Sequence, residues 1–161
     1  MKRKLLILNH SLLLLCVSMY VGTGWSLVLF SFPAASQLTP DNYYSHFVPQ
    51  VEAATRFFTY MTGVMIVCAL IMIVAERKER LYRWFPIIVL VGVIVATLLT
   101  TRFIFPYNEA MREGITDPAQ LRETLGKWMS LNKVRVSLWT VQWLSMMSYF
   151  GIKTYRGEKS R

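Results

Sequence analysis

The sequence predicts an all-α integral membrane protein, a bundle of four transmembrane helices whose fourth helix extends beyond the outer membrane surface. Of the 161 residues, 54% are hydrophobic and only 17% are charged, whereas a soluble domain has about 25% charged residues. Several apolar stretches are each long enough to cross a bilayer, and basic residues concentrate in short segments between them. We expect one domain, covering residues 1–161.

A transmembrane helix requires about 20 apolar residues, because it rises about 1.5 Å per residue across a core of about 30 Å. The stretches with this property cover, approximately, residues 5–32, 53–75, 85–105 and 134–152. The first could also be a secretory signal peptide cleaved near Ala35. Because the apolar core of a signal peptide spans only about 7–15 residues, we expect an uncleaved span.

The distribution of lysine and arginine predicts the orientation. The two terminal segments and the connection between the second and third spans carry 11 basic residues and a net charge of +8, and the rest of the chain carries +1 of the total +9. The basic residues are Lys2, Arg3, Lys4, Arg77, Lys78, Arg80, Arg83, Lys153, Arg156, Lys159 and Arg161. We therefore expect both termini in the cytoplasm, the chain in the cell (inner) membrane, and no nucleic-acid partner.

The two outer segments, residues 33–52 and 106–133, are expected to be loops except where a fourth helix begins. Turn-forming residues such as Pro40 and Pro49 hinder a long helix in the first segment. In the second, Asp117 followed by Pro118 and Gln120 is typical of a capped helix start. Steps of four and three residues then predict one helix from 118 to about 152, roughly 50 Å long. Its buried seam is Leu121, Leu125, Trp128, Asn132, Arg135, Trp139, Gln142, Met146 and Tyr149.

Polar residues of this seam predict a pocket at the outer end of the bundle. Polar groups inside a membrane are costly unless they face the bundle interior. The candidate catalytic residues are Asn108, Asn132 and Arg135. The candidate ligand-binding residues are Glu52, Arg56, Arg102, Tyr107, Trp128 and Trp139. Glu52 and Arg56 are one helical turn apart and can pair on one helix face. Since basic residues outnumber acidic ones there, an anionic, phenolic or carbonyl ligand is favoured.

A structural interpretation of the same residues stays open. Asn108, Asn132 and Arg135 can form a hydrogen-bond network between helices, and Gln142 can join two helices in mid-membrane. Arg102 and Lys133, at helix ends, can extend toward the lipid headgroups.

The sequence contains no clear pattern of metal-binding or cofactor-binding residues. His10 and His46 are the only histidines and are expected on opposite sides of the membrane, which argues against a haem with two histidine ligands. Cys16 and Cys68 lie in apolar runs and are expected to be buried free thiols. We predict no metal and no cofactor.

The chain resembles a family of small four-helix membrane proteins, mostly of unknown function, that includes the fungal anthrone oxygenases. The resemblance rests on Gly22-Thr23-Gly24 with Pro33, on Thr100 and Thr101 through Phe105-Pro106-Tyr107-Asn108, and on Trp128 followed by Asn132-Lys133-Val134-Arg135. Lys133 stands where histidine is common in that family. The resemblance implies oxidation of an electron-rich aromatic substrate without a cofactor, and the matched motif positions are Asn108, Asn132 and Arg135.

Two functions are consistent with these features. The first is a membrane enzyme or binding protein for an aromatic or other small hydrophobic molecule, with its pocket on the outer side. The alternative is a non-catalytic accessory or scaffold subunit of a homo- or hetero-oligomeric membrane complex, which exposed apolar residues at 121, 125 and 128 would favour. A channel or transporter is disfavoured, because we find no inverted repeat and expect no polar stripe in the cytoplasmic half.

Overall fold

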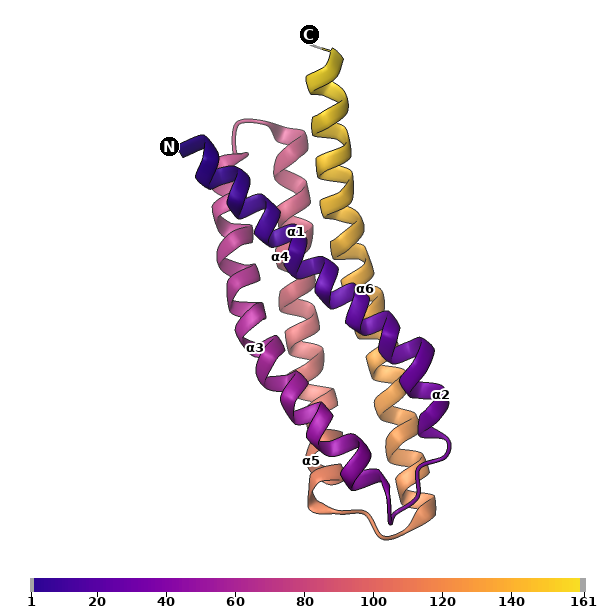
Figure 1. Ribbon diagram of the computed structural model, residues 1–161. Coiled ribbons are helices and arrows are strands. Elements are labelled where there is room, and N and C mark those ends of the chain that lie inside the picture. The colour runs from indigo at the N-terminus through magenta and orange to yellow at the C-terminus, as the bar shows by residue number, and fades with distance from the viewer. Residues whose placement is uncertain (1, 160–161) are drawn as a thin grey trace.

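The computed structural model describes residues 2–159, so Arg161 lies outside it, and it consists of helices joined by short connections (Figure 1). Its elements are α1 (Lys2–Ser26), the π-helical segment η1 (Leu27–Ser31), α2 (Phe32–Ala35), α3 (Tyr43–Ala75), α4 (Arg80–Leu99), the π-helical segment η2 (Thr100–Ile104), α5 (Phe105–Glu113) and α6 (Pro118–Lys159). The all-α class is confirmed.

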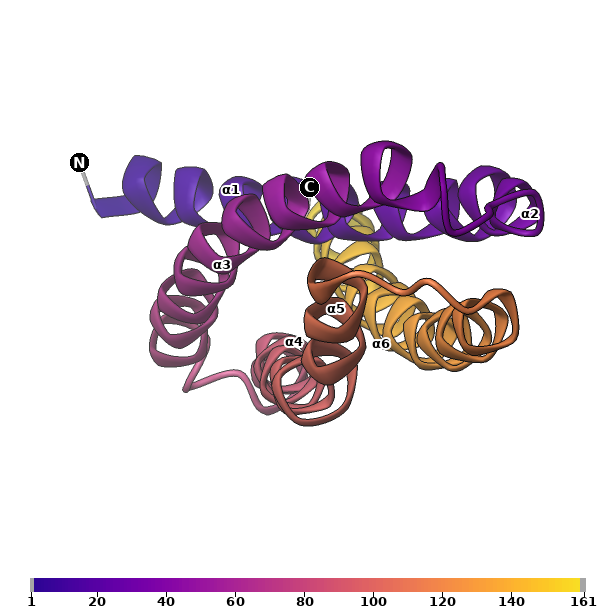
Figure 2. The same ribbon diagram turned by 90° about the horizontal axis from the view of Figure 1, so that it is seen from below.

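The long helices α1, α3, α4 and α6 form a ring in which α1 and α4 each pack against both α3 and α6 (Figure 2). Both terminal helix ends and the α3–α4 connection lie at one end, which we call the basic end (Figure 1). The helices α2 and α5 and their connections lie at the opposite, distal end. The described parts of the three basic segments therefore share one end of the bundle.

Three helical segments are long and apolar enough to cross a membrane: Lys4–Ala35, Tyr43–Ala75 and Arg80–Glu113. Their outward faces carry exposed apolar side chains such as Leu8, Tyr60 and Leu98. Such a surface is unfavourable in water and suited to lipid. The fourth long helix, α6, is not among these candidates, because Arg135, Gln142 and several hydroxyl residues lower its hydropathy.

Two buried clusters hold the bundle together. The larger lies between the four long helices and includes Leu13, Met65 and Met146. The smaller lies at the distal end and includes Phe32, Tyr43, Ile104, Met111, Leu121, Leu125 and Trp128. Within it the Tyr43 hydroxyl donates a hydrogen bond to the Met111 carbonyl at 3.0 Å and accepts one from the Ile115 backbone N–H at 2.6 Å. This hydroxyl joins the start of α3 to the connection between α5 and α6.

The predicted seam of α6 is confirmed. All its members are buried except Arg135, which is partly exposed. The predicted start is also confirmed, since the Asp117 carboxylate accepts hydrogen bonds from the backbone N–H groups of Ala119 and Gln120. Close packing against the seam needs Gly24, where a Cβ atom would lie 2.8 Å from the Trp139 ring.

The predicted outer loops are wrong in extent. The helix α3 begins at Tyr43 and contains Pro49, because burial of Tyr43 and Val48 in the distal cluster outweighs the one backbone hydrogen bond that proline removes. Pro106 lies in the first turn of α5, where proline is tolerated, so that helix runs on to Glu113. The first turns of α6 are consequently packed among α2, α3 and α5 rather than standing alone beyond the bundle.

Candidate functional site

A cavity of about 500 Å³ lies between α1, α3, α4 and α6, a volume in the range of small-molecule sites. Its lining runs from Asn108 and Trp128 at the distal end to Met65 and Gln142 in the middle of the bundle. Both π-helical segments contribute to the wall, through Leu27 and Ser31 of η1 and Thr100, Thr101 and Ile104 of η2. Such π-turns inside α-helices are frequent at functional sites.

Arg135 is the only charged side chain lining this cavity within residues 2–159. Its guanidinium carbon lies 4.7 Å from the centre of the Trp139 ring. Its Nε atom is buried without a partner, and Arg135 forms no ion pair with any residue of the described part of the chain. The rest of the side chain borders the cavity and is partly exposed. An arginine inside a helix bundle without an anionic partner is unfavourable unless water or a ligand solvates it, so the site favours a ligand that brings a negatively charged or strongly polar oxygen.

Gln142 supplies a second unpaired donor on the same helix face. Its side chain is 1% exposed and its Nε2 atom has no hydrogen-bond partner. It packs directly on Gly92 of α4, where a Cβ atom would lie 2.7 Å from Gln142 Cγ. Gln142 is two helical turns, or about 10 Å, from Arg135, so the two donors are within reach of one small molecule.

Threonine hydroxyls of α3, α4 and η2 also line the cavity. Each donates a hydrogen bond to a backbone carbonyl one turn earlier, as Thr55 does to Val51 at 2.8 Å. The other members of this set are Thr59, Thr62, Thr97, Thr100 and Thr101. Since their protons are used, these oxygens are left to accept hydrogen bonds. The cavity therefore offers donors on α6 and acceptors on α3, α4 and η2.

Aromatic rings form a further part of the cavity wall. The Trp139 ring lies 4.8 Å from the Tyr20 ring and 5.7 Å from the Phe58 ring, centre to centre. The Tyr20 hydroxyl is held by the Phe58 carbonyl and the Thr62 hydroxyl, at 2.8 and 2.7 Å. Flat apolar walls of this kind suit a planar hydrophobic molecule.

The sequence-predicted pocket is divided by the structure. Asn108, Trp128, Arg135 and Trp139 line the main cavity, and the Asn108 side-chain oxygen accepts a hydrogen bond from Trp128 Nε1 at 2.7 Å. Asn132 lies outside the lining. It is 0% exposed, its amide donates to the Trp128 carbonyl at 2.8 Å, and its Oδ1 atom has no partner.

The remaining predicted residues lie in neighbouring hollows. Glu52 and Arg56 line a smaller hollow between α3 and α5, but they do not form the ion pair that their spacing allows. Arg102 and Tyr107 line a surface hollow next to Lys127 on α6. These two residues are separated from Asn108 because the third segment places residues 101, 105 and 108 on the cavity side and residues 102, 103 and 107 on another face.

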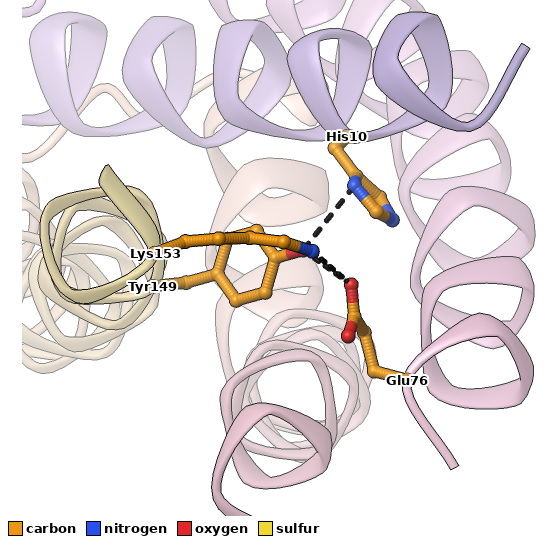
Figure 3. Close-up of polar contacts among 4 residues, drawn as sticks. All are labelled: His10, Glu76, Tyr149 and Lys153. Atoms are coloured by element: carbon orange, nitrogen blue, oxygen red, sulfur yellow. Dashed lines mark hydrogen bonds and ion pairs between the residues drawn. The ribbon is translucent and has the colours of Figure 1, made fainter. Parts of the chain in front are cut away.

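A second polar cluster, His10, Glu76, Tyr149 and Lys153, lies at the basic end (Figure 3). The Glu76 carboxylate accepts hydrogen bonds from the Tyr149 hydroxyl and from Lys153 Nζ, both at 2.5 Å. His10 Nδ1 lies 3.4 Å from the same hydroxyl. This cluster was not predicted from the sequence. Extending the seam by one more step of four, from Tyr149 to Lys153, would have revealed it.

This basic-end cluster joins α1, the end of α3 and α6. Glu76 caps α3 and is 8% exposed. Burial by itself would raise the pKa of Glu76, but the hydrogen bonds from Lys153 and Tyr149 hold that pKa below its usual value. The ionised carboxylate thus stabilises the packing of three helices at this end.

The histidines and cysteines lie apart from the cavity. His10 belongs to the basic-end cluster, and His46 is exposed near the start of α3 at the distal end. Cys16 and Cys68 are free and buried, as predicted. No group of three or more histidine, cysteine, aspartate or glutamate residues between residues 2 and 159 is arranged to hold a metal ion.

No protein-family model, no curated protein and no solved structure matches this chain.

Proposed function

We propose that this chain is a four-span protein of the cell (inner) membrane that binds a small aromatic or other hydrophobic molecule carrying an oxyanion, phenol or carbonyl group. The cavity beside Arg135 is the proposed site, and the distal end is the extracytoplasmic side. The observation that carries the proposal is the guanidinium of Arg135, which faces a cavity without an anionic partner in the described chain.

Two features support α6 as the fourth span. It runs beside α1 and α4, with its polar seam turned into the bundle, where polar groups are tolerated in membranes. Its outward face exposes Val134, Val141, Leu144 and Met147. The accumulation of basic residues at the end that holds both termini supports a cytoplasmic location for that end.

The resemblance to anthrone oxygenases extends the proposal to oxidation of the bound aromatic molecule without a cofactor, with dioxygen as the oxidant. A ring CH2 group would become a carbonyl that takes one oxygen atom of O2, and the other oxygen atom would leave as water with the two hydrogens. Arg135 would stabilise the anionic form of such a substrate, the electron-rich form in which a phenol or enol is most easily oxidised. Asn108 and Asn132, bonded to Trp128, would act by positioning that wall of the cavity.

The scaffold alternative finds less support. It relied on an exposed apolar surface at Leu121, Leu125 and Trp128, and these side chains are at most 3% exposed because they pack in the distal cluster.

Binding of an aromatic acid tests the proposal. We expect naphthoate to quench the tryptophan fluorescence of the protein, since Trp128 and Trp139 line the cavity, and to bind more tightly than the neutral naphthamide. Arg135→Met is expected to weaken naphthoate binding by roughly 10- to 100-fold, since hydrogen bonds to charged groups contribute about 1.5–3 kcal/mol. Lys133→Met removes an equal charge from an exposed position and serves as the matched control. Equal affinity in the wild type and the folded Arg135→Met variant would exclude the site, and mass spectrometry of the purified protein would identify a natural ligand.

A further inference from the structure

A second hollow, of about 270 Å³, lies between α3 and α5 at the distal end. Five of its lining residues also line the main cavity, namely Phe47, Val51, Thr55, Phe105 and Asn108. The side chains of these five residues, which we call the neck, therefore border both spaces.

The outer hollow is bordered by charged residues that face water. Glu52, Arg56, Glu109 and Arg112 all line it and are exposed. Glu109 and Arg112 form an ion pair at 3.3 Å, and the four side chains together carry no net charge. A border of this kind keeps the hollow hydrated without trapping an ion of either sign.

The neck has one fixed side and one side that can move. Asn108 is held by its hydrogen bond from Trp128 at 2.7 Å, whereas Phe47 contacts Trp128 only through its ring, at 4.9 Å between centres. Phe47 and Phe105 are partly exposed, and ring contacts of this type are weaker than a buried hydrogen-bonded tie. Rotation of these two rings would connect the hollows without disturbing the helices.

We infer that the outer hollow is the access route to the Arg135 cavity, with Phe47 and Phe105 as its gate. The ligand, a small aromatic anion on the proposed function on which this inference rests, reaches Arg135 from the water at the distal end, between α3 and α5. Access from the lipid, between α3 and α4, is the competing route.

Cysteine labelling tests the route without any ligand. In a background carrying Cys16→Ala and Cys68→Ala, Thr62→Cys places one thiol in the main cavity beyond the neck, since Thr62 lines that cavity but not the outer hollow. The detergent-solubilised protein is treated with a negatively charged, water-soluble methanethiosulfonate, and the labelling rate is followed by mass spectrometry.

Substitutions of Val51 change the width of the neck. Val51→Trp is expected to slow labelling at least about tenfold, which corresponds to roughly 1.4 kcal/mol on the barrier, and Val51→Ala is expected to accelerate it. Phe57→Trp adds the same ring at a position of α3 that is 48% exposed and outside both hollows, and it should leave the rate unchanged. The opposite effects of Val51→Trp and Val51→Ala keep the test valid if the larger side chain impairs folding.

The charged border provides a second readout. Glu52→Gln is expected to speed labelling by the anionic reagent and to slow labelling by its trimethylammonium counterpart, each by about twofold at low salt.

The inferred route would be overturned if neither Val51 substitution changes the labelling rate, or if Thr62→Cys is labelled only by a lipid-soluble maleimide. Failure of the proposed function gives a different pattern, in which naphthoate does not bind although Thr62→Cys is still reached through the neck.

Discussion

Replacing Arg135 by methionine should make the ligand-free protein more stable. Methionine keeps most of the aliphatic length that packs in the cavity but removes the guanidinium, which has no ion-pair partner in the described chain and stacks on Trp139 at 4.7 Å. The variant loses this cation–π contact, of about 0.5–2 kcal/mol. It also loses the cost of an unpaired charge inside the bundle, which is several kcal/mol for a fully buried ion and smaller here because the Arg135 side chain is partly exposed.

The cost that is removed exceeds the contact that is lost, so the free energy of unfolding of Arg135→Met should be higher than that of the wild type by about 1–3 kcal/mol. For a chain of this length, each kcal/mol changes the melting temperature by about 2–4 °C. Thermal unfolding in detergent, followed by tryptophan fluorescence after removal of bound compounds, measures this change. Lys133→Met should stay within about 0.5 kcal/mol of the wild type, because Lys133 is exposed, and Arg135→Lys should show no gain because it keeps the charge.

If Arg135 instead stabilises the fold, its replacement by methionine should lower the melting temperature. If Arg135→Met melts below the wild type in the ligand-free state, the guanidinium is a brace between helices, and the reasoning from its unpaired charge to a ligand fails. Higher stability combined with weaker naphthoate binding is instead the pattern expected of a binding group kept at the expense of stability.

Three further substitutions test the packing of the bundle. Tyr43→Phe should lower the free energy of unfolding by about 1–3 kcal/mol in a denaturant titration, because the Ile115 N–H loses its partner; an unchanged value would show that this bond does not hold the distal end. Gly24→Ala should destabilise the protein by about 1–3 kcal/mol, because the new Cβ atom would lie 2.8 Å from the Trp139 ring. Gly22→Ala is the control: open space surrounds this position, so the substitution should be neutral or stabilising by up to about 1 kcal/mol. Equal melting temperatures of the two variants would contradict the packing of α1 on α6. Because the pKa of Glu76 is lowered in the folded state, the ionised carboxylate adds to the free energy of unfolding at pH values above the usual glutamate pKa. This added stability is lost as the pH falls through the folded-state pKa. Acid should therefore destabilise the wild type more than Glu76→Gln, and parallel pH profiles of the two proteins would refute this.

Sequence periodicity predicted the regular parts of the fold because burial follows helix geometry directly. The seam from Leu121 to Tyr149 repeats in steps of three and four, and all but Arg135 are buried. The first residue of α6 could be predicted because an Asp-Pro pair carries its own capping chemistry.

The site was harder to predict, because periodicity does not show where helices separate. Arg135, Trp139, Trp128 and Asn108 could be assigned to one region, but the structure places Asn132, one turn before Arg135, against backbone rather than in the cavity. The threonine hydroxyls of α3 and α4 that line the cavity could not be predicted, since threonine in an apolar helix is common and its role depends on which helix it faces.

The π-helical segments change how the chain tolerates alterations in length. A π-turn accommodates one more residue than an α-helical turn, and one residue corresponds to roughly 100° of rotation about a helix axis. The apolar faces of the helices before and after η1, or before and after η2, are therefore rotated relative to each other. The face on one side of the π-helical segment matches the four-helix core, and the face on the other side matches the distal cluster. Deleting a single residue within Leu27–Ser31 or Thr100–Ile104 would restore a continuous α-helix and bring the two faces into one phase. The distal third would then turn its buried side chains outward, and the wall that both segments give to the Arg135 cavity would be lost while the basic half kept its packing.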